Sequence, residues 1–195
     1  LHYPLAAVNF RNLVPMCDDC NERPRKGTKD VLFKDAGRTM RRAFYYPYSK
    51  PGGVALSVAC SARPKPENPS GTWKVKAKAV KPNENELVTA WDSVFEVQTR
   101  FSARVREGLK GWMKDFLNTK DYSASPTVAQ LRKDLAAKAA WLSKPEQMRT
   151  KAEAALQAAA FRYMAADAPD DMLAGYAGVA TSLAVVGRPT ALGNN

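Results

Sequence analysis

The chain has 195 residues, of which 45% are hydrophobic and 25% charged, a composition typical of folded domains and unlike that of disordered or fibrous chains. No apolar run approaches the roughly 20 residues that a membrane helix needs, so we expect no membrane-embedded part. The formal net charge is +11, which indicates a polyanionic partner more readily than a neutral one.

The positive charge is concentrated in the first part of the chain. Residues 1–85 hold 16 Lys and Arg against 7 Asp and Glu, whereas residues 86–195 hold 14 against 12. A basic segment beside a nearly neutral one predicts a polyanion-facing module followed by a structural body. The alternative is a surface whose lysines serve only solubility.

The first predicted elements are one short helix and a β-hairpin. Residues 30–42 are expected to form the helix, interrupted at Gly37. After an aromatic, Pro-rich loop, two stretches alternate apolar with small or polar residues, Val54 to Cys60 and Thr72 to Val80. This period of two predicts a pair of strands.

The second predicted strand carries a row of lysines. Lys74, Lys76 and Lys78 occupy alternate positions and point to one face, with Trp73 and Val75 on the other. Such a row is either a solvated face or a surface that follows a phosphate backbone, and spacing alone does not choose between them.

Helices are expected from Glu86 onward, because apolar residues then recur mostly at steps of three and four. The first is a long helix, bent near Gly108 or Gly111. Ser125 predicts an N-cap for the second, and Ser143 opens a capping box for the third. The expected ranges of the later helices are 126–142, 144–166 and 170–185.

Cys17 and Cys20 have the spacing at which both thiolates reach one zinc ion at about 2.3 Å. Structural zinc takes four ligands, whereas Cys60 lies in a predicted strand and His2 is the single histidine. A redox pair is the other interpretation, although the surroundings lack the βαβ pattern of a thioredoxin-type site. We expect a second cysteine pair, from outside these residues, to complete a zinc site.

The stretch NLVPMCDDCN and the Lys-Gly pair after it resemble the second half of the HNH nuclease motif, N-L-x-x-x-C-x-x-C-N-x-x-K-G. Asn12, Cys17, Cys20 and Asn21 fall on this pattern, and the one departure is two extra residues before Lys26. The resemblance continues more weakly through RRAFYYPYS and is faint in the helical part. Among HNH proteins, this part of the chain is similar to the Septu-type nucleases of bacterial anti-phage defence, which act beside an ATPase partner.

The resemblance implies roles for these residues. Asn12 would hold the general base in position, Asn21 would bind Mg²⁺ or Mn²⁺, and the two cysteines would bind a structural Zn²⁺. An amide oxygen suits a hard cation. Such a cation polarises a phosphodiester while a neutral imidazole takes a proton from water.

The imidazole is not where the family has it. His2 is ten residues before Asn12 and follows Leu, whereas the family places an Asp-His pair further upstream. We therefore expect the chain to begin inside a nuclease domain, with the pair before Leu1. The alternatives are His2 acting as base in a shortened loop, and a nuclease remnant that survives as a binding subunit.

Six basic residues after the motif are candidates for contact with DNA phosphates, which would give salt-dependent affinity without sequence preference. The alternative is a solvated basic helix. They are Lys26, Lys29, Lys34, Arg38, Arg41 and Arg42.

We predict an α+β protein with a partial ββα-metal nuclease module over residues 1–50, a β-hairpin region over 51–85 and a helical bundle over 86–195. Its predicted function is metal-dependent cleavage of DNA in the bacterial cytoplasm, as the effector of an anti-phage system with an ATPase partner. The alternatives are a non-catalytic zinc-knuckle subunit that binds nucleic acid or a partner, and a thiol-redox protein.

Overall fold

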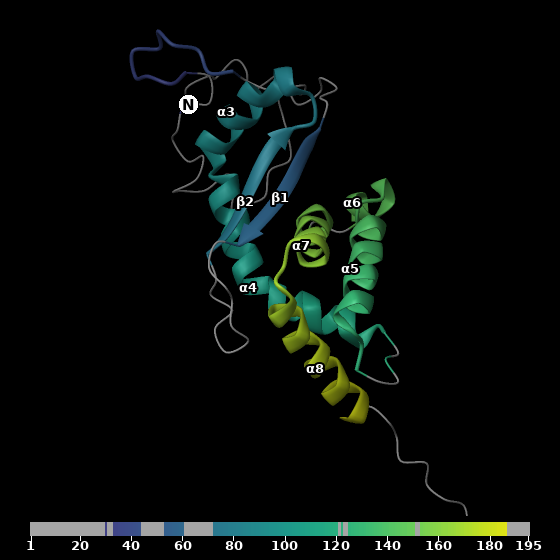
Figure 1. Ribbon diagram of the computed structural model, residues 1–195. Coiled ribbons are helices and arrows are strands. Elements are labelled where there is room, and N and C mark those ends of the chain that lie inside the picture. Colours follow the sequence, from purple (N-terminus) through teal and green to yellow (C-terminus); the bar gives the residue numbers. More distant parts are fainter. Residues whose placement is uncertain are drawn as a thin grey trace, which may run out of the picture. The chain divides into compact units, whose positions relative to one another are not determined.

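The computed structural model describes residues 30, 33–43, 53–60, 72–120, 122, 125–150 and 153–186 (Figure 1). Among them, a two-stranded antiparallel sheet is combined with helices, which confirms the α+β class. No helix in these ranges has the length and apolar character to cross a membrane. The elements are β1 (Val54–Cys60), β2 (Trp73–Ala79), the 3-10 helix η2 (Pro82–Glu84), α3 (Asn85–Phe95), α4 (Val97–Asn118), α5 (Val128–Leu142), α6 (Pro145–Thr150), α7 (Ala154–Ala166) and α8 (Asp170–Val186).

The chain divides into two compact units. The first comprises Leu1–Ala55 and Lys76–Arg100, and the second comprises Leu56–Val75 and Phe101–Asn195. The partial ββα-metal module was predicted over residues 1–50, of which the structure describes residues 30 and 33–43. The zinc knuckle was predicted on Cys17 and Cys20, which lie outside the described ranges.

The hairpin has the strands and the faces that the sequence predicted. Val58, Trp73 and Val75 are buried, whereas Lys74, Lys76 and Lys78 are exposed. A strand with period-two alternation has only one way to bury its apolar residues, so the pattern determines the face of every side chain.

The edge of β2 that faces away from β1 is covered by side chains of α3 and α4. Backbone N–H groups of alternate β2 residues donate to side-chain oxygens, which satisfies donors that an edge strand usually leaves open. The pairs are Val75 with Ser102 Oγ at 2.9 Å, Ala77 with Gln98 Oε1 at 3.2 Å, and Ala79 with Asn85 Oδ1 at 3.0 Å.

The segment predicted as the first helix is a turn instead. Phe33 and Arg41 pair in an antiparallel bridge. Between them, the Asp35 carboxylate accepts the backbone N–H of Thr39 at 3.0 Å and that of Met40 at 2.8 Å. Those N–H groups would be helix donors, and the carboxylate offers them an acceptor that competes with the helical pattern.

This turn should depend on pH. The N–H donors of Thr39 and Met40 hold the pKa of Asp35 below its ordinary value. Because the pKa of Asp35 is lower in the folded state, its ionised carboxylate stabilises the turn above the unfolded pKa of about 4. This stabilisation is lost as the pH falls through the folded pKa. We expect the exchange protection of both amides to decrease below about pH 4, whereas Asp35→Asn should remove that dependence. Equal protection in the parent at acidic and neutral pH would contradict this.

The predicted long helix is two helices, α3 and α4, separated at Glu96. This residue is left-handed, with φ 53° and ψ 39°, so the interruption lies at Glu96, whereas Gly108 and Gly111 lie inside the continuous helix α4. The Asp92 carboxylate accepts the N–H of Gln98 at 2.7 Å and thereby caps the start of α4. The start of α4 is therefore stabilised by the side chain of Asp92, which lies four residues before Glu96, and not by a glycine.

The core of the second unit lies between the helices, with α5 and α7 in the most extensive contact. Leu131 and Leu135 of α5 are fully buried, and Phe161 of α7 packs against Phe116 with ring centroids 5.7 Å apart. The many alanines of α7 permit this close approach, because small side chains let helix backbones come near each other.

Two predicted helix starts are also corrected. Thr127, not Ser125, caps α5, and its side chain accepts the N–H of Gln130 at 3.1 Å. Ser143 is the C-cap of α5 and donates its hydroxyl to the Ala139 carbonyl at 2.8 Å. The single helix expected over 144–166 is consequently the pair α6 and α7, while α8 confirms the last predicted helix.

Candidate nucleic-acid interface

The predicted site residues fall into two groups. Four basic residues lie in the described turn, and no cluster of His, Cys, Asp or Glu in the described part of the chain is arranged to hold a metal ion. The zinc and magnesium sites stay predictions, because their residues lie outside the described ranges. Those outside are Asn12, Cys17, Cys20, Asn21, Lys26 and Lys29.

Arg42 is the most engaged of the four described basic residues. Its Nη1 donates to Ser93 Oγ of α3 at 2.5 Å and its Nη2 to the Phe33 carbonyl at 3.3 Å. Its Nε is buried and has no hydrogen-bond partner among the described groups. These contacts hold the turn against α3, which favours a structural role for this guanidinium.

The other three basic residues of the turn reach the surface. Lys34 and Arg41 are exposed, and Arg38 has 45% of its side chain exposed beside Asp30, with its Nε 3.4 Å from the carboxylate. Arg38 is also left-handed, with φ 57°. The turn therefore offers positive charge that the pairing with Asp30 partly offsets.

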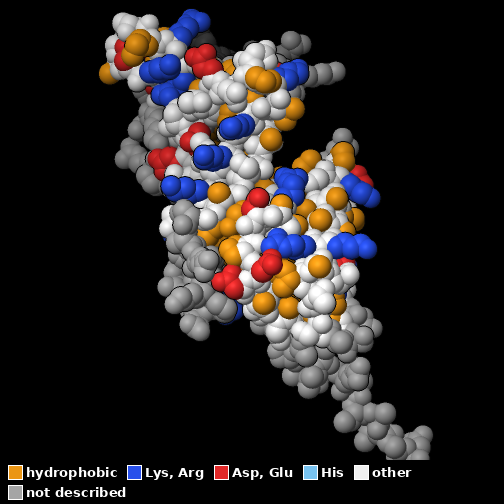
Figure 2. Space-filling model, in the orientation of Figure 1, with side chains coloured by type: hydrophobic (Ala, Val, Ile, Leu, Met, Phe, Trp, Pro, Cys, Tyr) orange, Lys and Arg blue, Asp and Glu red, His pale blue; other side chains and the backbone are white. Residues whose placement is uncertain are grey.

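The row of lysines on β2 is a second basic surface, and Figure 2 shows a row of basic side chains over the hairpin. Alternate residues of a strand are about 6.7 Å apart. The residues of β1 on the same face are small and exposed, so β1 places no bulky side chain beside the row. They are Ala55, Ser57 and Ala59.

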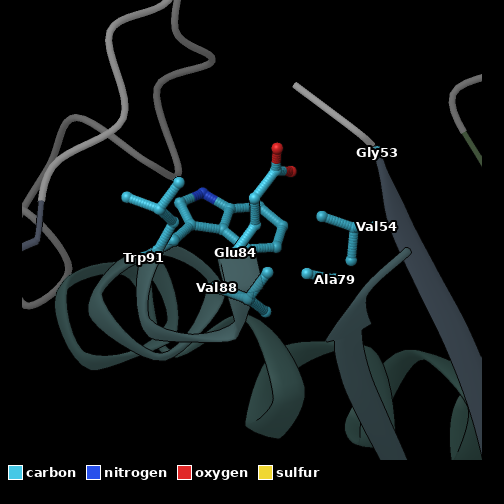
Figure 3. A pocket seen from close by; sticks show the side chains of 7 residues that line it. Gly53, Val54, Ala79, Glu84, Val88 and Trp91 are labelled. Atoms are coloured by element: carbon cyan, nitrogen blue, oxygen red, sulfur yellow. The ribbon is translucent and has the colours of Figure 1, made fainter. Parts of the chain in front are cut away.

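An apolar pocket of about 260 Å³ lies in the first unit (Figure 3). Trp91 belongs to the stripe from which the long helix was predicted, yet 37% of it is exposed. The described walls are apolar apart from Glu84 and provide space for an apolar group. Its lining residues are Gly53, Val54, Ala79, Glu84, Leu87, Val88 and Trp91.

Sequence reasoning found the lysine row and the basic residues near Asp35, but it missed the turn that carries them, the pocket and the cover on β2. Both depend on residues distant in the chain, as with Val54 and Trp91 of the pocket. No family model matches the chain, and no curated protein or solved structure is significantly similar to it.

Proposed function

We propose that the chain is a metal-dependent DNA endonuclease of the HNH type that acts with a protein partner, the ATPase subunit of an anti-phage system. The observation that carries the proposal is the arrangement of Asn12, Cys17, Cys20 and Asn21 in one short stretch. Its support from the structure is general: exposed cations at the turn after the motif suit a phosphate-rich substrate.

In this function the asparagines act on the metal and on the base. Mg²⁺, when bound, would polarise the scissile phosphate. The Asn21 amide would supply an oxygen ligand without adding a negative charge beside the phosphate, and Asn12 would keep the general base oriented. Lys34 and Arg41 would reduce the repulsion between neighbouring phosphates.

Cleavage of plasmid DNA by the purified protein, with Mg²⁺ or Mn²⁺ and with a chelator as control, tests the proposal. Metal-dependent nicking supports an endonuclease. Binding of DNA without nicking, in the presence of the partner as well, supports the second candidate, a non-catalytic nucleic-acid-binding subunit. The observation in favour of this candidate is that the exposed lysine row of β2 needs no catalytic group to bind DNA.

The zinc part of the proposal has its own test. Cys17→Ser and Cys20→Ser should each remove most of the bound zinc, because a tetrahedral site that loses a thiolate holds the ion far more weakly. Cys60→Ser is the matched control and should keep the zinc, since Cys60 lies in β1. Elemental analysis of the purified variants measures the effect. A parent without zinc but with a titratable disulfide would instead support the thiol-redox alternative.

A further inference from the structure

We propose that Lys74, Lys76 and Lys78 of β2 bind the phosphodiester backbone of one nucleic-acid strand without reading its bases. The row is separate in sequence from the motif residues. It therefore adds a binding surface to the proposed endonuclease, and it holds whether or not the chain cleaves DNA.

The geometry of the strand suits a repeating anion. Three exposed lysines at alternate positions place their stems on one line, about 6.7 Å apart, which is comparable with the separation of neighbouring phosphates along a nucleic-acid strand. On the same face, β1 contributes Ala55, Ser57 and Ala59, so a backbone can approach the ammonium groups closely. None of these neighbours is aromatic, and base stacking is therefore not expected there.

The charges of the row are not balanced within the described part of the protein, where no ion pair involves these lysines. Some cations elsewhere are paired, such as Arg132 with Asp170 at 2.7 Å and Lys120 with Asp134 at 3.3 Å. Like charges side by side on one face repel each other. An anion with charges at the same interval removes this repulsion, whereas scattered solubilising lysines would not need to be in line.

A second explanation for lysines on a two-stranded sheet is that they prevent an open edge from pairing with another chain. The edge of β2 does not need this protection, because Ser102, Gln98 and Asn85 already accept its outward N–H groups. The row is therefore best explained by a ligand on the face of the strand.

The character of this face favours nucleic acid over a lipid surface. Stable binding to an anionic membrane combines basic residues with apolar side chains that enter the interface. Beside the lysines, β1 exposes two alanines and a serine, Ala55, Ala59 and Ser57, and Val80, which follows Lys78 by two residues, is 60% exposed. Apart from this single valine, these residues supply little apolar area. A regular series of phosphates requires only charge at regular intervals.

The test compares two triple variants that remove the same charge. One is Lys74→Gln/Lys76→Gln/Lys78→Gln; its control is Lys110→Gln/Lys114→Gln/Lys133→Gln, at exposed helix positions. Affinity for a labelled DNA strand of about 16 nucleotides is measured by anisotropy, without divalent metal, at several salt concentrations. Three lost contacts should reduce the slope of log K against log salt by about 2, and the control should keep most of the parental slope.

The slopes of two oligonucleotides of different sequence should agree, and Lys76→Gln alone should lower the slope by about 0.7. Equal slopes in the two triple variants would overturn the proposal, as would parental protein that binds phosphatidylserine vesicles through these lysines but not DNA. Circular dichroism checks the fold, and the single variant decides if the triple one is unfolded. If the protein fails to cleave DNA but shows these slopes, the endonuclease proposal is refuted and the proposal for the lysine row stands.

Discussion

Asn21→Ala is expected to reduce metal-dependent DNA cleavage by at least about a hundredfold, because it removes the amide oxygen proposed to bind the catalytic cation. The rate of plasmid nicking at saturating Mg²⁺ or Mn²⁺ measures this. Asn21→Asp keeps an oxygen at the same position and should retain part of the activity. The expected pattern is therefore a graded loss rather than an equal effect of both substitutions.

Asn9→Ala is the matched control, since Asn9 lies close to the motif in the chain but not on its pattern. This variant should cleave at the parental rate, and all three should have the parental circular dichroism spectrum. Undiminished cleavage by Asn21→Ala would remove the basis for the HNH assignment. The same outcome would leave the lysine row of β2 unaffected, because that surface is measured without divalent metal.

Phe161→Ala should destabilise the second unit by about 3–5 kcal/mol, the usual cost of removing a fully buried aromatic side chain. The Phe161 side chain is 1% exposed and contacts the ring of Phe116. Both the transfer of the ring to water and the cavity left in α7 contribute to the loss. Hydrogen exchange of the α5 and α7 amides follows this unit separately from the rest of the chain.

The control for this substitution is Met148→Ala on α6, where 47% of the residue is exposed. Its effect should stay within about 0.5–1 kcal/mol, because little apolar area returns to water. Similar losses for the two variants would mean that the interior of the second unit is less tightly packed than the burial of Phe161 indicates.

The elements that could be predicted from sequence are those whose pattern is local and repeated. The strands from Val54 and from Trp73 were predicted almost to the residue, because period-two alternation determines both their extent and their faces. The turn at Asp35 and the break at Glu96 were missed for the opposite reason. Each depends on one carboxylate that accepts hydrogen bonds from backbone N–H groups. This competition with regular helical hydrogen bonds produces no periodic pattern in the sequence.

The candidate site divides in a similar way. The lysine row could be predicted from the sequence, because residues at alternate positions of a strand lie on the same face. What argues against an edge-protecting role for these lysines is the cover on β2, and this involves Ser102 and Gln98, which follow their partners by 27 and 21 residues. No local pattern predicts hydrogen bonds over such separations. The motif around Asn12 was found only because it resembles a known family, not through any periodicity.

The cover on β2 also affects how this protein behaves when it is crowded or partly unfolded. Fibril growth requires a sheet to accept a new strand at each end in succession. On the β2 side, a recruit would first have to displace three side-chain hydrogen bonds, each of which contributes about 1 kcal/mol. A hairpin that is closed on one side cannot propagate in both directions, so these three polar side chains limit assembly of the sheet into fibrils.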